Sequence, residues 1–115
     1  MAQITALSFI VPVRDLDAAV RFYTSAFGLE VVFQADQIAF VGVAGSDTAI
    51  GLLRDPATAG TGPRNVGVHP DHDVGVDPVV AAVVAAGGRV VERGEHAPGA
   101  PFVRIADPDG NILWL

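Results

Sequence analysis

The sequence predicts an α+β fold made of two βαβββ modules. Three observations predict it: apolar, β-branched runs typical of strands, two stretches with apolar residues at helical spacing, and the repetition of the same order of elements. Asp17 and Asp77, near the starts of the two predicted helices, lie 60 residues apart. Of the 115 residues, 50% are hydrophobic and 17% are charged, so we expect a single domain over residues 1–115 with a packed core.

The first module covers about residues 1–54. A continuous apolar run at its start predicts a strand that is buried on both faces. The apolar residues that follow recur at helical spacing and stop at Gly28, a residue suited to the left-handed position after a helix. Asp15 and Asp17 are alternative N-caps of this helix. The expected elements are a strand over 4–13, a helix over 16–27, and strands over 29–33, 37–43 and 48–53.

A stretch rich in Pro, Gly and Thr over residues 55–64 has no periodic pattern and is expected to be a linker. The second module follows over about residues 65–115. Its helix is expected to begin with Asp77 as N-cap and Pro78 at the first helical position, and to end at Gly87. Its strands are expected over 65–70, 89–92, 102–106 and 112–115, with a loop over 94–100 and a four-residue hairpin turn over 107–110.

Charge and composition restrict the partners. The formal net charge is −6 and the sequence pI is about 4.7, which disfavours nucleic acid and anionic membranes and leaves small molecules or proteins. The chain has no Cys, no apolar run long enough to span a bilayer, and no phosphate-binding or nucleophile motif. We expect a cytoplasmic protein, and the abundance of Ala, Val and Gly is typical of a bacterial sequence.

Three segments carry a family resemblance. They are residues 13–23 followed by Phe27-Gly28-Leu29, residues 85–90, and residues 107–113. With them, the sequence resembles the glyoxalase/bleomycin resistance protein/dioxygenase family of the vicinal oxygen chelate superfamily. The resemblance implies that the strands curve into a cup, with the helices outside and a ligand cavity inside, and that the protein is a homodimer.

The resemblance also implies where a metal would bind. Metal enzymes of the superfamily place a His on the first strand and a Glu on the last strand of each module. The corresponding positions here are Ser8, Val68, Gly51 and Trp114, and none of these is a strong metal ligand. We therefore expect no metal cofactor, and a protein that resembles the bleomycin-resistance branch in binding or sequestering a small hydrophobic or aromatic molecule.

Cross-strand counting suggests which side chains line the cup. With four-residue turns, Phe40 lies opposite Gly51 and Val103 lies opposite Trp114. Phe40 and Trp114 would then face one cavity and hold a planar ligand between them, unless they are core residues of a cup filled by its own side chains in an interaction module. The expected ligand-binding residues are Ser8, Phe40, Gly51, Val68 and Trp114.

An alternative function is a metal-dependent lyase, isomerase or dioxygenase with an altered site. His69, the weak metal candidate, would bind a divalent cation together with Asp71 or His72. His96 falls in the predicted loop and is not assigned to a site. Three arginines could bind an anionic ligand, but we interpret them as solvated charges at strand ends or edges. They are Arg54, Arg64 and Arg104.

Overall fold

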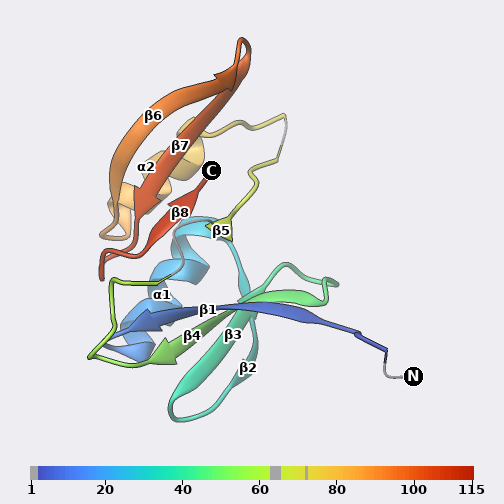
Figure 1. Cartoon of the computed structure of the whole chain (residues 1–115), viewed down its shortest axis with the longest axis vertical. Coiled ribbons are helices and arrows are strands. Elements are labelled where there is room, and N and C mark those ends of the chain that lie inside the picture. The colour runs from blue at the N-terminus through green and yellow to red at the C-terminus, as the bar shows by residue number, and fades with distance from the viewer. Residues whose placement is uncertain (1–2, 63–65, 72) are drawn as a thin grey trace.

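The computed structural model describes residues 3–62, 66–71 and 73–115. The strands form two four-stranded sheets, and each sheet is accompanied by one helix, which confirms the predicted α+β class with two βαβββ modules (Figure 1). In the first module β1 is parallel to β4, and the strand order is β1-β4-β3-β2. Its elements are β1 (Leu7–Val13), α1 (Leu16–Phe27), β2 (Glu30–Gln34), β3 (Ile38–Gly42) and β4 (Thr48–Arg54).

The second module repeats this topology with the order β5-β8-β7-β6, and β5 is parallel to β8. Its β6–β7 hairpin is long and curved, as Figure 1 shows in orange. The elements are β5 (Val66–Gly67), α2 (Asp77–Ala85), β6 (Arg89–Ala97), β7 (Ala100–Ala106) and β8 (Ile112–Trp114).

The helix caps follow the sequence in α1 but not in α2. Asp15 is the N-cap of α1, and its Oδ1 accepts a hydrogen bond of 3.0 Å from the backbone N–H of Ala18, while Gly28 ends the helix at φ 65°. Asp77 was expected to cap α2, but it already has helical geometry and Val76 is the N-cap. The Asp77 carboxylate instead forms an ion pair with Arg93, with 3.5 Å between Oδ1 and Nη1. No side chain caps this helix at its N-terminus. Neither helix in the described ranges is long and apolar enough to cross a membrane.

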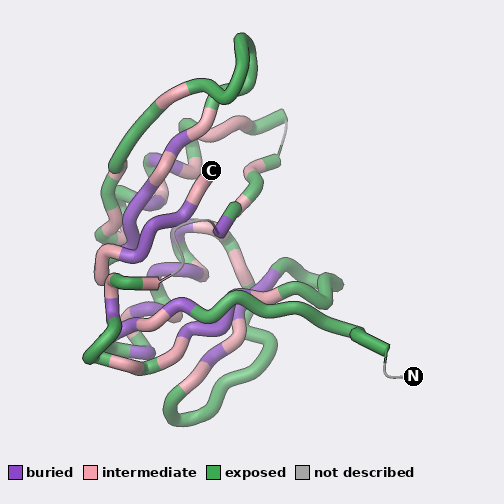
Figure 2. The backbone as a smooth tube through the Cα atoms, viewed as in Figure 1, coloured by how far each residue is buried: buried purple, intermediate pink, exposed green. Residues whose placement is uncertain are grey.

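One hydrophobic core runs through both modules between the sheets and the helices, and appears as the purple segments of Figure 2. Alternate residues of the central strands point into it, as the period of a strand requires. Its fully buried side chains include Val11, Val41, Leu52, Val83, Ile105 and Leu113.

Two strand predictions were wrong. The first strand begins at Leu7 rather than residue 4, and its residues from Leu7 to Ile10 are exposed instead of buried on both faces. The reason is that β1 is an edge strand, and only its second half, from Val11 to Val13, packs into the core. The prediction of a loop over 94–100 was also wrong, because β6 continues to Ala97 and pairs with β7.

A buried polar network joins the two modules. The Tyr23 hydroxyl of α1 donates a 2.8 Å hydrogen bond to Asp107 Oδ2, just after β7. Asn111 Nδ2 donates to the same oxygen at 2.9 Å and to the carbonyl of Pro12 at 2.8 Å, while Asn111 Oδ1 accepts from the Gly62 backbone N–H. Burial raises the pKa of Asp107, and burial together with the adjacent Asp107 carboxylate raises the pKa of Tyr23 well above its usual range.

Candidate functional site

The candidate site lies on the faces of the sheets that turn away from the helices. Side chains alternate along a strand, so the neighbours of each core residue point to this opposite face. We call it the cup face, and it consists of Ser8, Ile10, Phe40 and Gly51 in the first module and of His96, Phe102, Arg104 and Trp114 in the second.

In the first module, two apolar side chains cover Gly51. Phe40 pairs with Gly51 across β3 and β4, as predicted, and Ile10 pairs with it from β1. A Cβ atom placed on Gly51 would lie 2.6 Å from Ile10 Cδ1 and 3.0 Å from Phe40 Cε1. The Phe33 ring lies 6.2 Å from the Phe40 ring, centroid to centroid. The position at which the resemblance implies a Glu therefore sits in an apolar surface.

A pocket of about 410 Å³ opens beside Phe40. All of its lining residues belong to the first module, so Phe40 and Trp114 do not face each other across this pocket. Ser8 lines it, as expected of a cup residue, and the polar groups of Ser46 and Asp47 stand at the β3–β4 turn. The lining residues are Ala6, Leu7, Ser8, Val32, Phe33, Phe40, Ser46, Asp47 and Ala49.

In the second module, three rings gather on the cup face. His96 of β6 stacks on Trp114 of β8 with a centroid separation of 5.6 Å and an interplanar angle of 22°. Phe102 of β7 lies 4.6 Å from His96 and 5.0 Å from Trp114. Trp114 pairs with Arg104, not with Val103 as predicted, because the turn after β7 spans five residues rather than four. Trp114 nevertheless lies on the face where the sequence placed it.

Arg104 also belongs to this cluster. Its guanidinium Cζ lies 5.4 Å from the centroid of the Trp114 ring, and its Nη1 forms a 2.7 Å ion pair with Glu92. Its Nε is buried and has no hydrogen-bond partner within the part of the chain that the structure describes. The interpretation of Arg104 as an exposed edge charge was therefore wrong, since β7 is a central strand and the side chain is only 24% exposed.

Val68 does not lie on the cup face. It packs against the hydrophobic core, and its backbone N–H donates to the carbonyl of Trp114 at 2.7 Å. The β5 residue that pairs with Trp114 is Gly67. Val68 is turned away from the cup face because the buried pairing of Val66 with Leu113 sets the register of this short strand, and it lines a separate apolar pocket of about 270 Å³. Its role in ligand binding stays a prediction.

The residues at the superfamily's four metal positions do not fit a divalent cation. Ser8 offers only a hydroxyl, Gly51 and Val68 offer no donor side chain, and Trp114 can only donate a hydrogen bond. Across residues 3–62, 66–71 and 73–115, no three His, Cys, Asp or Glu side chains gather closely enough to hold a metal.

Of the alternative site, the structure describes His69 and Asp71, which line one pocket of about 260 Å³ together, and no third His, Cys, Asp or Glu gathers with them among the described residues. The imidazole lies beside Gly67, where an added Cβ would be 3.3 Å from Nε2. Asp71 Oδ1 accepts a 2.8 Å hydrogen bond from the backbone N–H of Asp73, which holds the carboxylate in a local turn. His72, the other proposed ligand, lies outside the described residues, as does Arg64.

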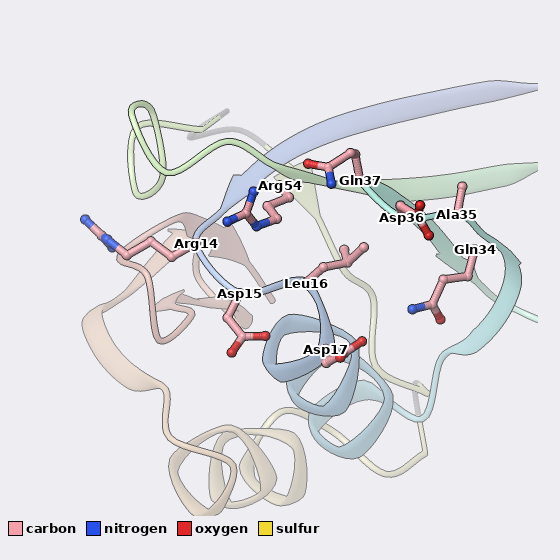
Figure 3. A pocket seen from close by; sticks show the side chains of 9 residues that line it. All are labelled: Arg14, Asp15, Leu16, Asp17, Gln34, Ala35, Asp36, Gln37 and Arg54. Carbon is pink, nitrogen blue, oxygen red and sulfur yellow. The ribbon is translucent and has the colours of Figure 1, made fainter.

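A second, polar pocket of about 480 Å³ lies at the other end of β1, where Arg54 was expected as a strand-end charge (Figure 3). Asp15 and Asp17 line it from the start of α1, and Arg54 lines it from the end of β4. The Arg14 side chain points away from the other lining residues and pairs with Asp109 at 3.1 Å. Charges of both signs and exposed side chains line this pocket, so it does not resemble the apolar cup face.

Sequence reasoning missed Ile10, Phe33, His96 and Phe102. The signal for Ile10 was available, because it alternates with the buried Val11 and shares the face of Ser8. His96 and Phe102 were hidden by the assumption that the hairpin loop begins at Gly94. A strand continued to Ala97 would have placed both on the face of Trp114.

The fold and this site define a class of protein: paired βαβββ modules that carry apolar and aromatic side chains on the cup face. The sequence model of the Glyoxalase/Bleomycin resistance protein/Dioxygenase superfamily matches residues 4–115, so the chain belongs to this superfamily. No match was found among curated proteins.

Solved structures share the fold at low sequence identity. A glyoxalase-related enzyme from Fulvimarina pelagi is 24% identical with a TM-score of 0.75, covering 98% of this chain and 86% of that chain. A lactoylglutathione lyase from Agrobacterium tumefaciens is 22% identical with a TM-score of 0.74, covering 99% and 93%. A bleomycin-binding protein from Streptomyces verticillus, complexed with copper(II)-bleomycin, is 20% identical with a TM-score of 0.72, covering 99% and 96%. These neighbours include both an enzyme and a binding protein, and at such identities they show the fold alone.

Proposed function

We propose that this protein binds a small, flat, hydrophobic or aromatic molecule on its cup face and does so without a metal. The observation that carries the proposal is the replacement of metal-ligand chemistry by apolar and aromatic chemistry. Phe40 and Ile10 cover Gly51, and the position of the second Glu is an indole surrounded by His96 and Phe102. Such surfaces bind flat rings by stacking and by burial of apolar area.

Charge supports a neutral or cationic ligand. The net charge of −6 attracts cations at long range, although salt screens this effect. Locally, Glu92 already neutralises Arg104 at 2.7 Å, so the aromatic cluster presents no unbalanced cation to an anionic ligand.

We also propose that two copies of the chain associate. Large apolar side chains are exposed on both edge strands of the first sheet, among them Phe9 at 46%, Phe33 at 55% and Leu7 at 62%. Patches of this kind on a small protein mark interaction surfaces, and a second copy would cover them. Sedimentation velocity at micromolar concentration is expected to give a dimer that Phe33→Glu dissociates. A monomeric wild type would contradict this part of the proposal.

Three bicyclic probes of different charge test the ligand class: quinoline, the N-methylquinolinium cation and quinoline-2-carboxylate. Trp114 is the only tryptophan of the chain, so quenching of its fluorescence reports binding next to it. Protein freed of metal with a chelator is expected to bind the neutral and cationic probes with saturation and to bind the anion more weakly. Absence of saturable quenching by all three would reject the proposed site.

Two variants locate the probe, and a third is their control. Calorimetry is expected to show that Trp114→Leu and Phe102→Leu each weaken quinoline binding about tenfold, which corresponds to ~1.4 kcal/mol. Val84→Ala shortens an exposed side chain of α2, away from the cup face, and is expected to leave the affinity unchanged. Equal losses in all three variants would indicate nonspecific binding to apolar surface rather than binding in the cup.

A further inference from the structure

The β6–β7 hairpin extends beyond the strand that supports it. β8 pairs with β7 from Ala106 to Arg104, and Leu115 adds backbone hydrogen bonds to Val103. β6 is an edge strand paired only with β7, and from Ala100 to Phe102 β7 in turn is paired only with β6, so the hairpin tip projects past β8 (Figure 1). The backbone of this outer part of the hairpin is therefore held by pairing between its own two strands alone.

Phe102 and Trp114 form the floor of the aromatic cluster. The Phe102 ring lies over Gly94 so closely that an added Cβ would be 2.6 Å from Cζ and 2.8 Å from Cε1. The Phe102 ring thus packs on the backbone of β6 at Gly94, where any larger residue would clash with the ring. Trp114 is fixed from below, because it follows the fully buried Leu113 and pairs with Arg104.

His96 lies on top of this floor. Its imidazole is nearly parallel to both rings, at 22° to Trp114 and 29° to Phe102, and the residue is exposed to solvent. It is a flat heteroaromatic ring, stacked where the proposed function places the ring of a ligand. It also comes from the part of the hairpin in which β7 has no backbone pairing with β8.

We propose that the imidazole of His96 occupies the ligand's stacking position on Trp114 and Phe102, and that a flat ligand ring binds by displacing it. This inference rests on the proposed function, since it concerns the same site. It narrows the ligand class to molecules that contain an unhindered flat ring, because a saturated or branched group cannot replace a stacked imidazole. It also predicts that His96 lowers the apparent affinity, because only the displaced state is competent to bind.

The first test examines the stack in the ligand-free protein by NMR. The ring currents of Trp114 and Phe102 are expected to move the imidazole C–H signals of His96 upfield of those of His69, and Trp114→Leu is expected to abolish this difference. Quinoline is expected to move the His96 signals toward those of His69 as the site fills. His96 signals that coincide with those of His69 in the free wild type would overturn the inference.

The second test measures affinity. His96→Ala is expected to bind quinoline about three- to tenfold more tightly than the wild type, since the intramolecular competitor is removed. His96→Phe, with a ring that stacks more strongly, is expected to bind it more weakly. His69→Ala is the matched control and is expected to bind like the wild type. Decahydroquinoline, a saturated analogue of similar size, is expected to bind no variant with saturation.

The outcomes separate this inference from the proposed function. Equal quinoline affinity in the wild type and His96→Ala would overturn the inference while leaving the aromatic site in place. Weaker binding by His96→Ala would also overturn it, because His96 would then be a ligand contact rather than a competitor. Failure of the wild type and all variants to bind any of the three probes would overturn both.

Discussion

Tyr23 is expected to control the stability of the fold at alkaline pH. It is the only tyrosine of the chain, it is completely buried, and its hydroxyl donates to Asp107. Burial and the neighbouring carboxylate raise the pKa of the folded-state phenol well above its usual range, whereas the phenol of the unfolded chain ionises near pH ~10. The contribution of Tyr23 to stability is therefore complete below pH ~10 and is lost as the pH rises further.

The pH dependence of the free energy of unfolding is set by the single phenolic proton of Tyr23. Above pH ~10 the unfolded chain loses the phenolic proton and the folded chain keeps it, so the free energy of unfolding falls by about 1.4 kcal/mol per pH unit. No Cys or Lys side chain titrates in this pH range, because the chain contains no Cys and its seven Lys and Arg residues are all Arg. Arginine stays protonated over this range, so Tyr23 is the only side chain expected to titrate there.

Urea unfolding followed by far-UV circular dichroism between pH 8 and pH 11.5 measures this slope. Wild type is expected to lose stability above pH ~10, and Tyr23→Phe, which has no phenol to ionise, is expected to show no comparable loss. Tyrosinate absorbance near 295 nm is expected to appear together with unfolding. A tyrosinate signal that develops with a midpoint near pH 10 while the protein remains folded would refute the reasoning, as would equal slopes for the two proteins.

Further predictions concern packing and hydrogen bonding at neutral pH. Tyr23→Phe is expected to cost about 1.5–3 kcal/mol in urea unfolding, because it removes a buried hydrogen bond to a carboxylate. Thr58→Val removes a hydroxyl–carboxylate bond of the same 2.8 Å length at an exposed site and is expected to cost below ~0.5 kcal/mol, so equal costs would deny the importance of burial. Gly88→Ala is expected to cost about 1–3 kcal/mol or more, because its Cβ would lie 2.7 Å from the backbone oxygen of Ala106 and 2.7 Å from Val83 Cγ1. Gly51→Ala meets only the ends of two side chains, one of them the half-exposed Ile10, and is expected to cost less; the reverse order of melting temperatures would contradict this interpretation.

The fold was predictable from the sequence because its signals are local. α1 begins after Asp15, whose side chain caps the helix, and ends at Gly28, whose backbone adopts the left-handed conformation. Phe40 pairs with Gly51, as counting across the hairpin indicates. The same counting gave the wrong partner for Trp114 in the β7–β8 hairpin, and the reason is a hydrogen-bonded turn. Asn111 donates its backbone N–H to Asp107 Oδ1, and its carbonyl accepts from the Asp107 N–H, which closes a five-residue turn and shifts the partner of Trp114 to Arg104.

The parts of the site that the sequence did not reveal depend on contacts distant along the chain. His96 joins the aromatic cluster because pairing with β7 extends β6 through a Gly- and Pro-containing stretch that locally resembles a loop. Val68 is turned into the core because Val66 pairs with the buried Leu113. The homodimer, the cytoplasmic location and the bacterial origin remain predictions, since no described feature tests them.

Calorimetric titration of quinoline into the protein, before and after exhaustive chelation and again after addition of Zn²⁺, Ni²⁺ or Mn²⁺, tests the central claim most directly. Saturable binding with the same affinity is expected in all conditions, with about tenfold weaker binding by Trp114→Leu. Binding that appears only with one of these cations, and that His69→Ala abolishes, would contradict the metal-free cup and point instead to a metal site at His69.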